Sequence, residues 1–253
     1  MAVVATEAHR DAPPDAERLR LTSLLSVLQL SDSAFPSGRY TLSHGLEALS
    51  QSGRLPTPSR ASQLLTLLSD AIRLGVGPSD GVALACAHRA HGSDGTADLV
   101  LLEHADRRLT AVKIPRESRE ASRRTGRALL DTAVGAFGGP ELSQIAARVS
   151  AGETPGNHAV ILGFLSAWLR IPRLDAVTGE LFAFAAGWVG AAVRLGLIDH
   201  RTAQGLLHRV RPVVVESALR ALDGEVTQIS GCTPLLDVMS MRHEQAGLRL
   251  FAT

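Results

Sequence analysis

The stretch from residue 156 to residue 196 constrains the fold most strongly, because it holds two very apolar helical segments in succession. Its longest uncharged run, from Leu181 to Val193, spans 13 residues. A membrane-spanning helix needs roughly 20 apolar residues, so this run is typical of a buried core helix. We expect helices near 156–170 and 175–196. Their small residues favour a packed core, and a dimer interface between Gly156 and Leu195 is the alternative.

The rest of the chain carries helical patterns and no convincing set of alternating strands. Thr57-Pro58 and Thr233-Pro234 each pair a capping threonine with a proline at the first helical position. The sequence predicts an all-α protein with one bundle-like domain of about ten helices at 19–253, after a disordered arm at 1–18. Further helices are expected near 19–31, 39–51, 78–91, 96–112, 115–134 and 200–222, with GVGP (75–78) ending one helix before the next begins.

Composition excludes several classes of function. Hydrophobic residues make up 45% and charged residues 20%, as in a globular protein, and the net charge of +1 gives no electrostatic case for nucleic acid or an anionic membrane surface. Cys86 and Cys232 form neither a disulfide framework nor a zinc pattern. Acids and prolines stand where a signal peptide would be apolar. We therefore expect a cytoplasmic protein.

Catalytic motifs are missing from the sequence. It has no P-loop, no glycine-rich dinucleotide fingerprint, no H-E-x-x-H, no G-x-S-x-G elbow and no CxxC. The alternative to a non-catalytic protein is a metal-dependent enzyme in a helical bundle, for which His44 and Glu47 would be one ligand pair on a helix. Such a site needs a second pair, and the sequence offers none. We predict no catalytic residue, no cofactor-binding residue and no metal ligand.

Two charged features remain. The helix after Pro115 places arginines 116, 119, 123 and 127 on one face and small residues on the other. The arginine face is either solvated or a partner-binding surface. The chain then ends in MRHEQAGLRLFAT, an apolar end with Leu248, Leu250 and Phe251 after Gly247 and Arg249 among them. Chain ends are usually polar, so this tail is expected to dock on its own domain or on a partner.

Three segments together resemble the urease accessory protein UreF family. They are LLSVLQLSDSAFPSGRYTLSHGLEAL, PRESREASRRTGRALL, and AAVRLGLIDHRTAQGLL with the later PLLDVMSMRHEQAGLRLFAT. Their order and spacing match that family over nearly all of the chain after residue 20. The chain departs from the family pattern at Arg39, where a glycine is usual, at Tyr40, where phenylalanine is usual, and at His44, which is often glutamine. Losing that glycine would restrict the turn after Pro36.

The resemblance implies an all-helical homodimer that acts as a non-catalytic adaptor. UreF proteins bind UreD (also called UreH) and the GTPase UreG, and the assembly acts on apo-urease to install nickel. The resemblance also implies that nickel is handled in transit, without a tightly bound cofactor, and that GTP hydrolysis is modulated. The partner-binding residues expected from the matching motifs are Pro36, Gly38, Tyr40, His44, Glu47, Arg242, His243, Glu244, Arg249, Leu250 and Phe251.

Overall fold

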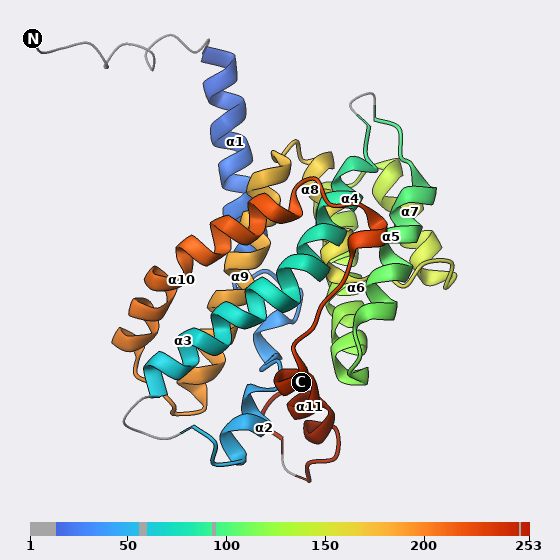
Figure 1. Ribbon diagram of the computed structural model, residues 1–253. Helices are drawn as coiled ribbons and strands as arrows, with labels where there is room; N and C mark the ends of the chain where they lie inside the picture. The colour runs from blue at the N-terminus through green and yellow to red at the C-terminus, as the bar shows by residue number, and fades with distance from the viewer. Residues whose placement is uncertain (1–13, 56–59, 93–94, 248) are drawn as a thin grey trace, which may run out of the picture.

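The computed structural model describes residues 14–55, 60–92, 95–247 and 249–253. Helix α8 (His158–Trp168) lies at its centre, between α4 (Val82–Arg89) and α6 (Arg116–Phe137) (Figure 1). Glycines allow both contacts. A Cβ at Gly163 would collide with the Leu84 carbonyl, and one at Gly126 with the Gly156 carbonyl. The small residues of α8 therefore serve the core, as the simpler interpretation of the sequence had it.

Helix α9 (Arg173–Arg194) packs against α10 (His200–Ala221) and α1 (Pro14–Ser31). By length and composition α9 could cross a membrane, but more than half of its most apolar window is buried inside the protein. Trp188, near its middle, is fully buried. Burial on this scale identifies α9 as a core helix of this domain.

The segment GVGP does not end a helix, contrary to our prediction. Helix α3 (Arg60–Asp70), a π-helical segment (Ala71–Gly81) and α4 form one continuous rod. Pro78 lies inside it, and a proline ring clashes with the carbonyl four residues earlier, here that of Leu74. That carbonyl instead accepts the Cys232 N–H at 2.8 Å. A donor from outside the helix therefore satisfies the carbonyl that Pro78 leaves without an N–H partner.

The other elements complete an all-helical fold, and the all-α prediction is confirmed. They are α2 (Leu46–Gln51), α5 (Leu99–Val112), α7 (Pro140–Ser150), α11 (Pro234–His243) and short 3₁₀ turns at Arg39–Thr41 and Val226–Gln228. The described residues contain no strand, and only one isolated bridge, His91 with Ala97.

Two helix boundaries differ from the predictions. Residues 14–18 belong to α1 instead of a disordered arm, whereas 1–13 and the predicted Thr57-Pro58 start lie outside the described residues. The predicted helix at 39–51 is broken at 42–45, because His44 and Gly45 take positive φ angles of 51° and 80°. A Cβ at Gly45 would meet the Leu236 carbonyl, so this break lets α2 pack closely on α11.

Candidate partner-binding site

The C-terminal segment 249–253, called the tail below, lies against α2, α6 and α11. Figure 1 shows the chain end beside α2 and α11. Three side chains that we call the seat receive the tail: Glu47 from α2, Glu117 from α6 and His243 from α11. Of the two expectations for the tail, the structure shows docking on its own domain.

Glu47 binds the tail backbone directly. Its carboxylate is fully buried and accepts the N–H groups of Leu250 at 2.8 Å and Phe251 at 3.1 Å. It also lies 3.0 Å from His243 Nε2. A buried carboxylate needs such a full set of donors, because an unpaired charge away from water is very costly.

Glu117 binds the other side of the same histidine. Its Oε2 lies 2.8 Å from His243 Nδ1, and its Oε1 accepts a hydrogen bond from Arg249 at 2.8 Å. The residue occupies the first turn of α6, where the helix dipole favours a negative charge. Its own N–H donates to Glu244 at 3.2 Å. The arginine of the tail is thus an anchor of the tail.

Beyond Phe251 the tail pairs with the loop before α2. Ala252 N–H donates to the Thr41 carbonyl at 2.8 Å, and Ser43 N–H donates to the Thr253 carbonyl at 3.1 Å. His44 N–H reaches the Thr253 hydroxyl at 3.4 Å. The strained His44 backbone is therefore held where the tail meets the loop.

Arg194 of α9 joins the tail to the exposed loop. Its guanidinium lies 3.9 Å from the Tyr40 ring centre and 4.5 Å from that of Phe251, and it donates to the Tyr40 carbonyl. A cation between two aromatic faces is favourable on both sides. Arg194 lies within the matching segment after Ala191, but no local pattern in the sequence indicates this contact.

The predicted partner-binding residues fall into three groups by exposure. Glu47, His243 and Phe251 are buried, so in this conformation they cannot touch a partner and act by holding the tail. Leu250, in contrast, is 73% exposed. The other exposed members are Pro36, Gly38, Tyr40, Arg242 and Arg249, while Glu244 and His44 are half-buried.

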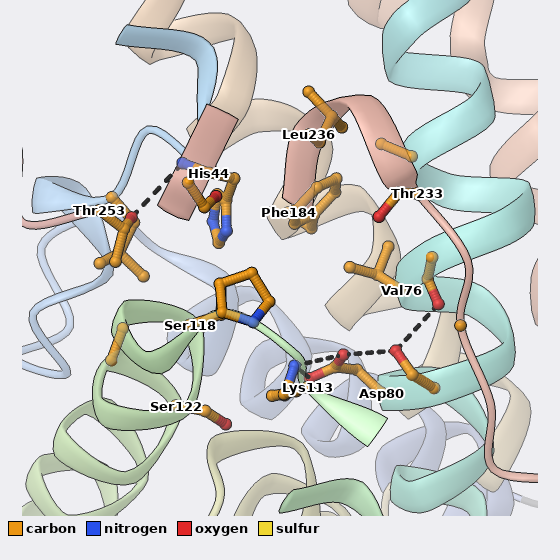
Figure 2. Close-up of a pocket in the computed structure, with 18 of the residues that line it drawn as sticks. His44, Val76, Asp80, Lys113, Ser118, Ser122, Phe184, Thr233, Leu236 and Thr253 are labelled. Atoms are coloured by element: carbon orange, nitrogen blue, oxygen red, sulfur yellow. Dashed lines mark hydrogen bonds and ion pairs between the residues drawn. The ribbon is translucent and has the colours of Figure 1, made fainter. Parts of the chain in front are cut away.

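A cavity of about 150 Å³ adjoins the tail (Figure 2). His44 and Phe184 line one side, and the ion pair of Lys113 with Asp80 (2.8 and 2.9 Å) lines the opposite side. Thr253 forms part of the wall. The end of the tail is therefore part of the cavity wall, which includes both apolar and charged side chains.

A second ion pair borders the cavity and involves Arg39, where a glycine was expected. Its guanidinium binds Glu180 with two hydrogen bonds of 2.7 and 3.1 Å and lies 3.2 Å from His158 Nε2. Its φ angle is not positive, so the turn does not need a glycine here. The substitution leaves the turn unstrained and places a cation on a buried carboxylate.

The cavity shifts the titration of its groups in both directions. Burial, together with the charges of Arg39 and Lys113, lowers the pKa of His44 to about 4. Burial and Arg39 lower the pKa of His158 to about 3. Burial raises the pKa of Glu180 despite Arg39, whereas the Lys113 ammonium lowers that of Asp80 against the effect of burial. Both imidazoles are therefore neutral near pH 7.

The proposed metal-ligand pair of His44 and Glu47 does not form. His44 lies outside α2 and lines the cavity, while Glu47 faces the tail. Within the part of the chain that the structure describes, no three His, Cys, Asp or Glu side chains are grouped so that they could share a metal ion.

The arginine face of α6 differs from the seat. Arg116, Arg123 and Arg127 are exposed, and Arg119 bonds the carbonyls of Lys113 and Ile114. The opposite face buries small side chains against α8 as predicted, among them Ala121 and Thr125.

Comparisons with known proteins agree with this architecture. The family model named UreF matches residues 59–211, which is more than half of the chain. The chain belongs to the UreF family. It is 32% identical over 232 residues to the urease accessory protein UreF of Trichodesmium erythraeum, an alignment that covers 92% of this chain and 97% of that protein.

More distant UreF relatives align over a similar length. The urease accessory protein UreF 2 of Brucella canis is 28% identical, over 91% of this chain and 92% of its own. The UreF of Yersinia enterocolitica is 26% identical, over 92% of this chain and all of its own. The chain therefore corresponds to nearly the whole length of these UreF proteins.

Proposed function

We propose that this UreF-family chain is a non-catalytic scaffold of urease maturation in the cytoplasm. In this proposal it binds UreD (UreH) and the GTPase UreG and acts with them on apo-urease. Nickel is the cargo of the assembly, and the scaffold holds no resident metal. A change in the rate of GTP hydrolysis by UreG belongs to the same proposal and is measured in the same reconstitution.

The seated tail is the observation that carries this proposal. The seat holds the tail with Leu250 exposed to solvent, and the Arg194 guanidinium contacts both the exposed Tyr40 and Phe251. Tyrosine and arginine are enriched at protein interfaces, and Tyr40 and Arg249 are both exposed here, as is Leu250. The carboxylates of the seat are all occupied by donors, which suits a structural role better than a chemical one.

Co-purification with UreD and UreG tests the proposal. We expect a chain lacking residues 249–253 to lose most of the capture of both partners, because the deletion removes the tail but leaves α11 and the seat. Leu250→Ser is the matched variant, since it changes only an exposed side chain. Undiminished capture of both partners by the shortened chain would show that the tail is not part of the interface.

The homodimer is also a proposal. Helix α8 is buried within the domain, so only the open face of α9 is left from the region first considered for an interface. Nothing lies within 4 Å of a Cβ placed at Gly187 or Gly190, and α1 exposes Leu24, Leu25 and Leu28. Gly187→Leu should shift the mass in light scattering from dimer to monomer while circular dichroism stays helical. A folded, dimeric variant would exclude this face.

A further inference from the structure

The cavity between the π-helical segment and α6 contains a polar group that the protein leaves without a partner. Ser122 is only 8% exposed, its Oγ lines the cavity, and no described residue forms a hydrogen bond with that oxygen. A buried hydroxyl without a partner is costly, so an occupant of the cavity is needed to satisfy it. We propose that this cavity binds one small neutral amide, a molecule with a carbonyl oxygen and an N–H group.

Other polar groups around the cavity also have hydrogen-bonding capacity left. Ser118 lies one turn before Ser122 on α6, and its hydroxyl forms no hydrogen bond with any of the described residues. The same holds for the ring nitrogens of His44, which line the cavity from the other side (Figure 2). Lys113 has three N–H donors, and its ammonium bonds only Asp80. Three elements thus present unused donors and acceptors to the same cavity.

This set of groups matches the two ends of an amide. A neutral imidazole has one N–H donor and one acceptor nitrogen, and a hydroxyl both donates and accepts. His44 is neutral near pH 7, because burial and the neighbouring cations lower its pKa to about 4. The amide carbonyl can therefore accept from Ser122 or Lys113, while the amide N–H donates to His44 or Ser118.

The charges around the cavity do not favour an ion. Arg39 is paired with Glu180, and Lys113 with Asp80. A third carboxylate, that of Asp237, also lines the wall, so an anion gains no net attraction. A cation would have to compete with Arg39 and Lys113 for the carboxylates of the two pairs, each of which already accepts two hydrogen bonds. A neutral molecule brings no further charge into the buried site and avoids that desolvation cost.

The volume and the apolar part of the wall limit the size of the ligand. The cavity volume is about 150 Å³, and an engineered cavity of about that volume in another protein binds benzene. Val76, Ala121 and Phe184 line the cavity beside the polar groups and can contact a methyl group. A molecule of the size of acetamide therefore fits. Water is the competing occupant, because a cavity of this volume holds several water molecules.

The hydrogen-bonding groups of the site all lie before α10. Ser118 and Ser122 belong to α6, Lys113 follows α5, and His44 precedes α2. The π-helical segment Ala71–Gly81 supplies the wall beside them, and such helices are frequent at functional sites. Since none of these donors and acceptors lies on α11 or the tail, the binding groups do not depend on the position of either.

A series of ligands with one shape and three charges tests the proposal on the full chain. Acetamide is neutral, acetate is an anion and acetamidinium is a cation. Nuclear magnetic resonance follows the His44 ring, with the exposed His208 ring as the control. We expect acetamide to shift His44 saturably, with a millimolar Kd because so few atoms bind, and both ions to bind at least about tenfold more weakly. Binding of either ion within tenfold of acetamide would overturn the neutral site. No saturable shift with acetamide would show that the cavity holds only water.

Ser122→Ala tests the contact that carries the proposal. The change removes an unpaired hydroxyl, so the fold should be preserved. We expect acetamide to bind about tenfold more weakly, which is the effect of losing one hydrogen bond. Ser143→Ala, on the exposed surface of α7, is the matched control and should bind acetamide as the unmodified chain does. Unchanged binding by Ser122→Ala would overturn the proposal. No partner is used, so the result is independent of the proposed function.

Discussion

Helix α6 carries two sets of charged residues, one buried and the other exposed to solvent. At its start, Glu117 is buried and bonded to His243 and Arg249. Further along the helix, Arg123 and Arg127 are exposed, and no ion pair is formed by either among the described residues. The two sets lie within three turns of each other on one helix and differ in burial.

The difference teaches where a substitution should matter. A buried charge that loses its partner costs several kcal/mol, whereas an exposed charge contributes little. The seat should therefore decide stability and the position of the tail, and the arginine face should affect only binding. The predictions below test this contrast, from the largest expected effect to the smallest.

Glu47→Ala should have the largest effect. It leaves two tail amides and His243 without their acceptor, so we expect a loss of about 3–5 kcal/mol in unfolding free energy. Urea denaturation followed by circular dichroism measures it. Glu120→Ala is the control, because Glu120 is a glutamate on α6 whose side chain is exposed. Equal stability of the two variants would contradict the contrast between buried and exposed charge.

Lys113→Met tests the buried pair of the cavity. Methionine keeps most of the length but leaves Asp80 without its cation, so we expect a loss of about 2–3 kcal/mol. Arg220→Met is the matched control, since Arg220 pairs with Glu216 on an exposed helix surface. Thermal unfolding of both variants measures the difference. The prediction is wrong if Lys113→Met is as stable as the control.

The cavity histidines predict a dependence on pH. The pKa values of His44 and His158 are lowered to about 4 and about 3 in the folded state. The unfolded chain therefore binds more protons below its ordinary pKa of about 6.5, and stability falls as the pH drops below that value. Each histidine should contribute about 1.4 kcal/mol per pH unit until its folded pKa is reached.

Denaturant titrations from about pH 7 to about pH 4 measure this slope. His158→Gln should make the slope shallower, and the exposed His208→Gln should leave it unchanged. An identical slope in all three proteins would show that the buried imidazoles are not the cause.

The arginine face should show the smallest effect on stability. Replacing Arg123 and Arg127 together by alanine should change the unfolding free energy by less than about 0.5 kcal/mol per residue. Capture of UreD and UreG with the same variant tests whether this face is solvated or binds a partner. Lost capture at unchanged stability would make it a partner-binding surface, and unchanged capture would make it a solvated one.

Periodicity was enough to predict the helical fold, because apolar stripes and the Thr233-Pro234 start of α11 are local signals. The continuous rod through Pro78 could not be predicted, since its free carbonyl is bonded by Cys232, more than 150 positions away in the chain. The break before α2 was not predicted for the same reason, because His44 is hydrogen-bonded to Thr253 at the other end of the sequence.

The candidate site was predicted in part. Matching motifs indicated Glu47, His243 and Arg249 as partner-binding residues, but no expectation was attached to Glu117. An acidic residue at the start of a helix usually reflects the helix dipole, so its bond to the tail has no signature of its own. Arg194 was not predicted, because stacking between two aromatic rings depends on tertiary contacts alone.

Hydrogen exchange of the unmodified chain tests the central claim, that the tail is part of the folded domain. The account predicts that the Leu250 and Phe251 amides exchange far more slowly than in an unstructured peptide, because a buried carboxylate accepts both. Exchange at the rate of an unstructured peptide, while the amides of α8 stay protected, would contradict it.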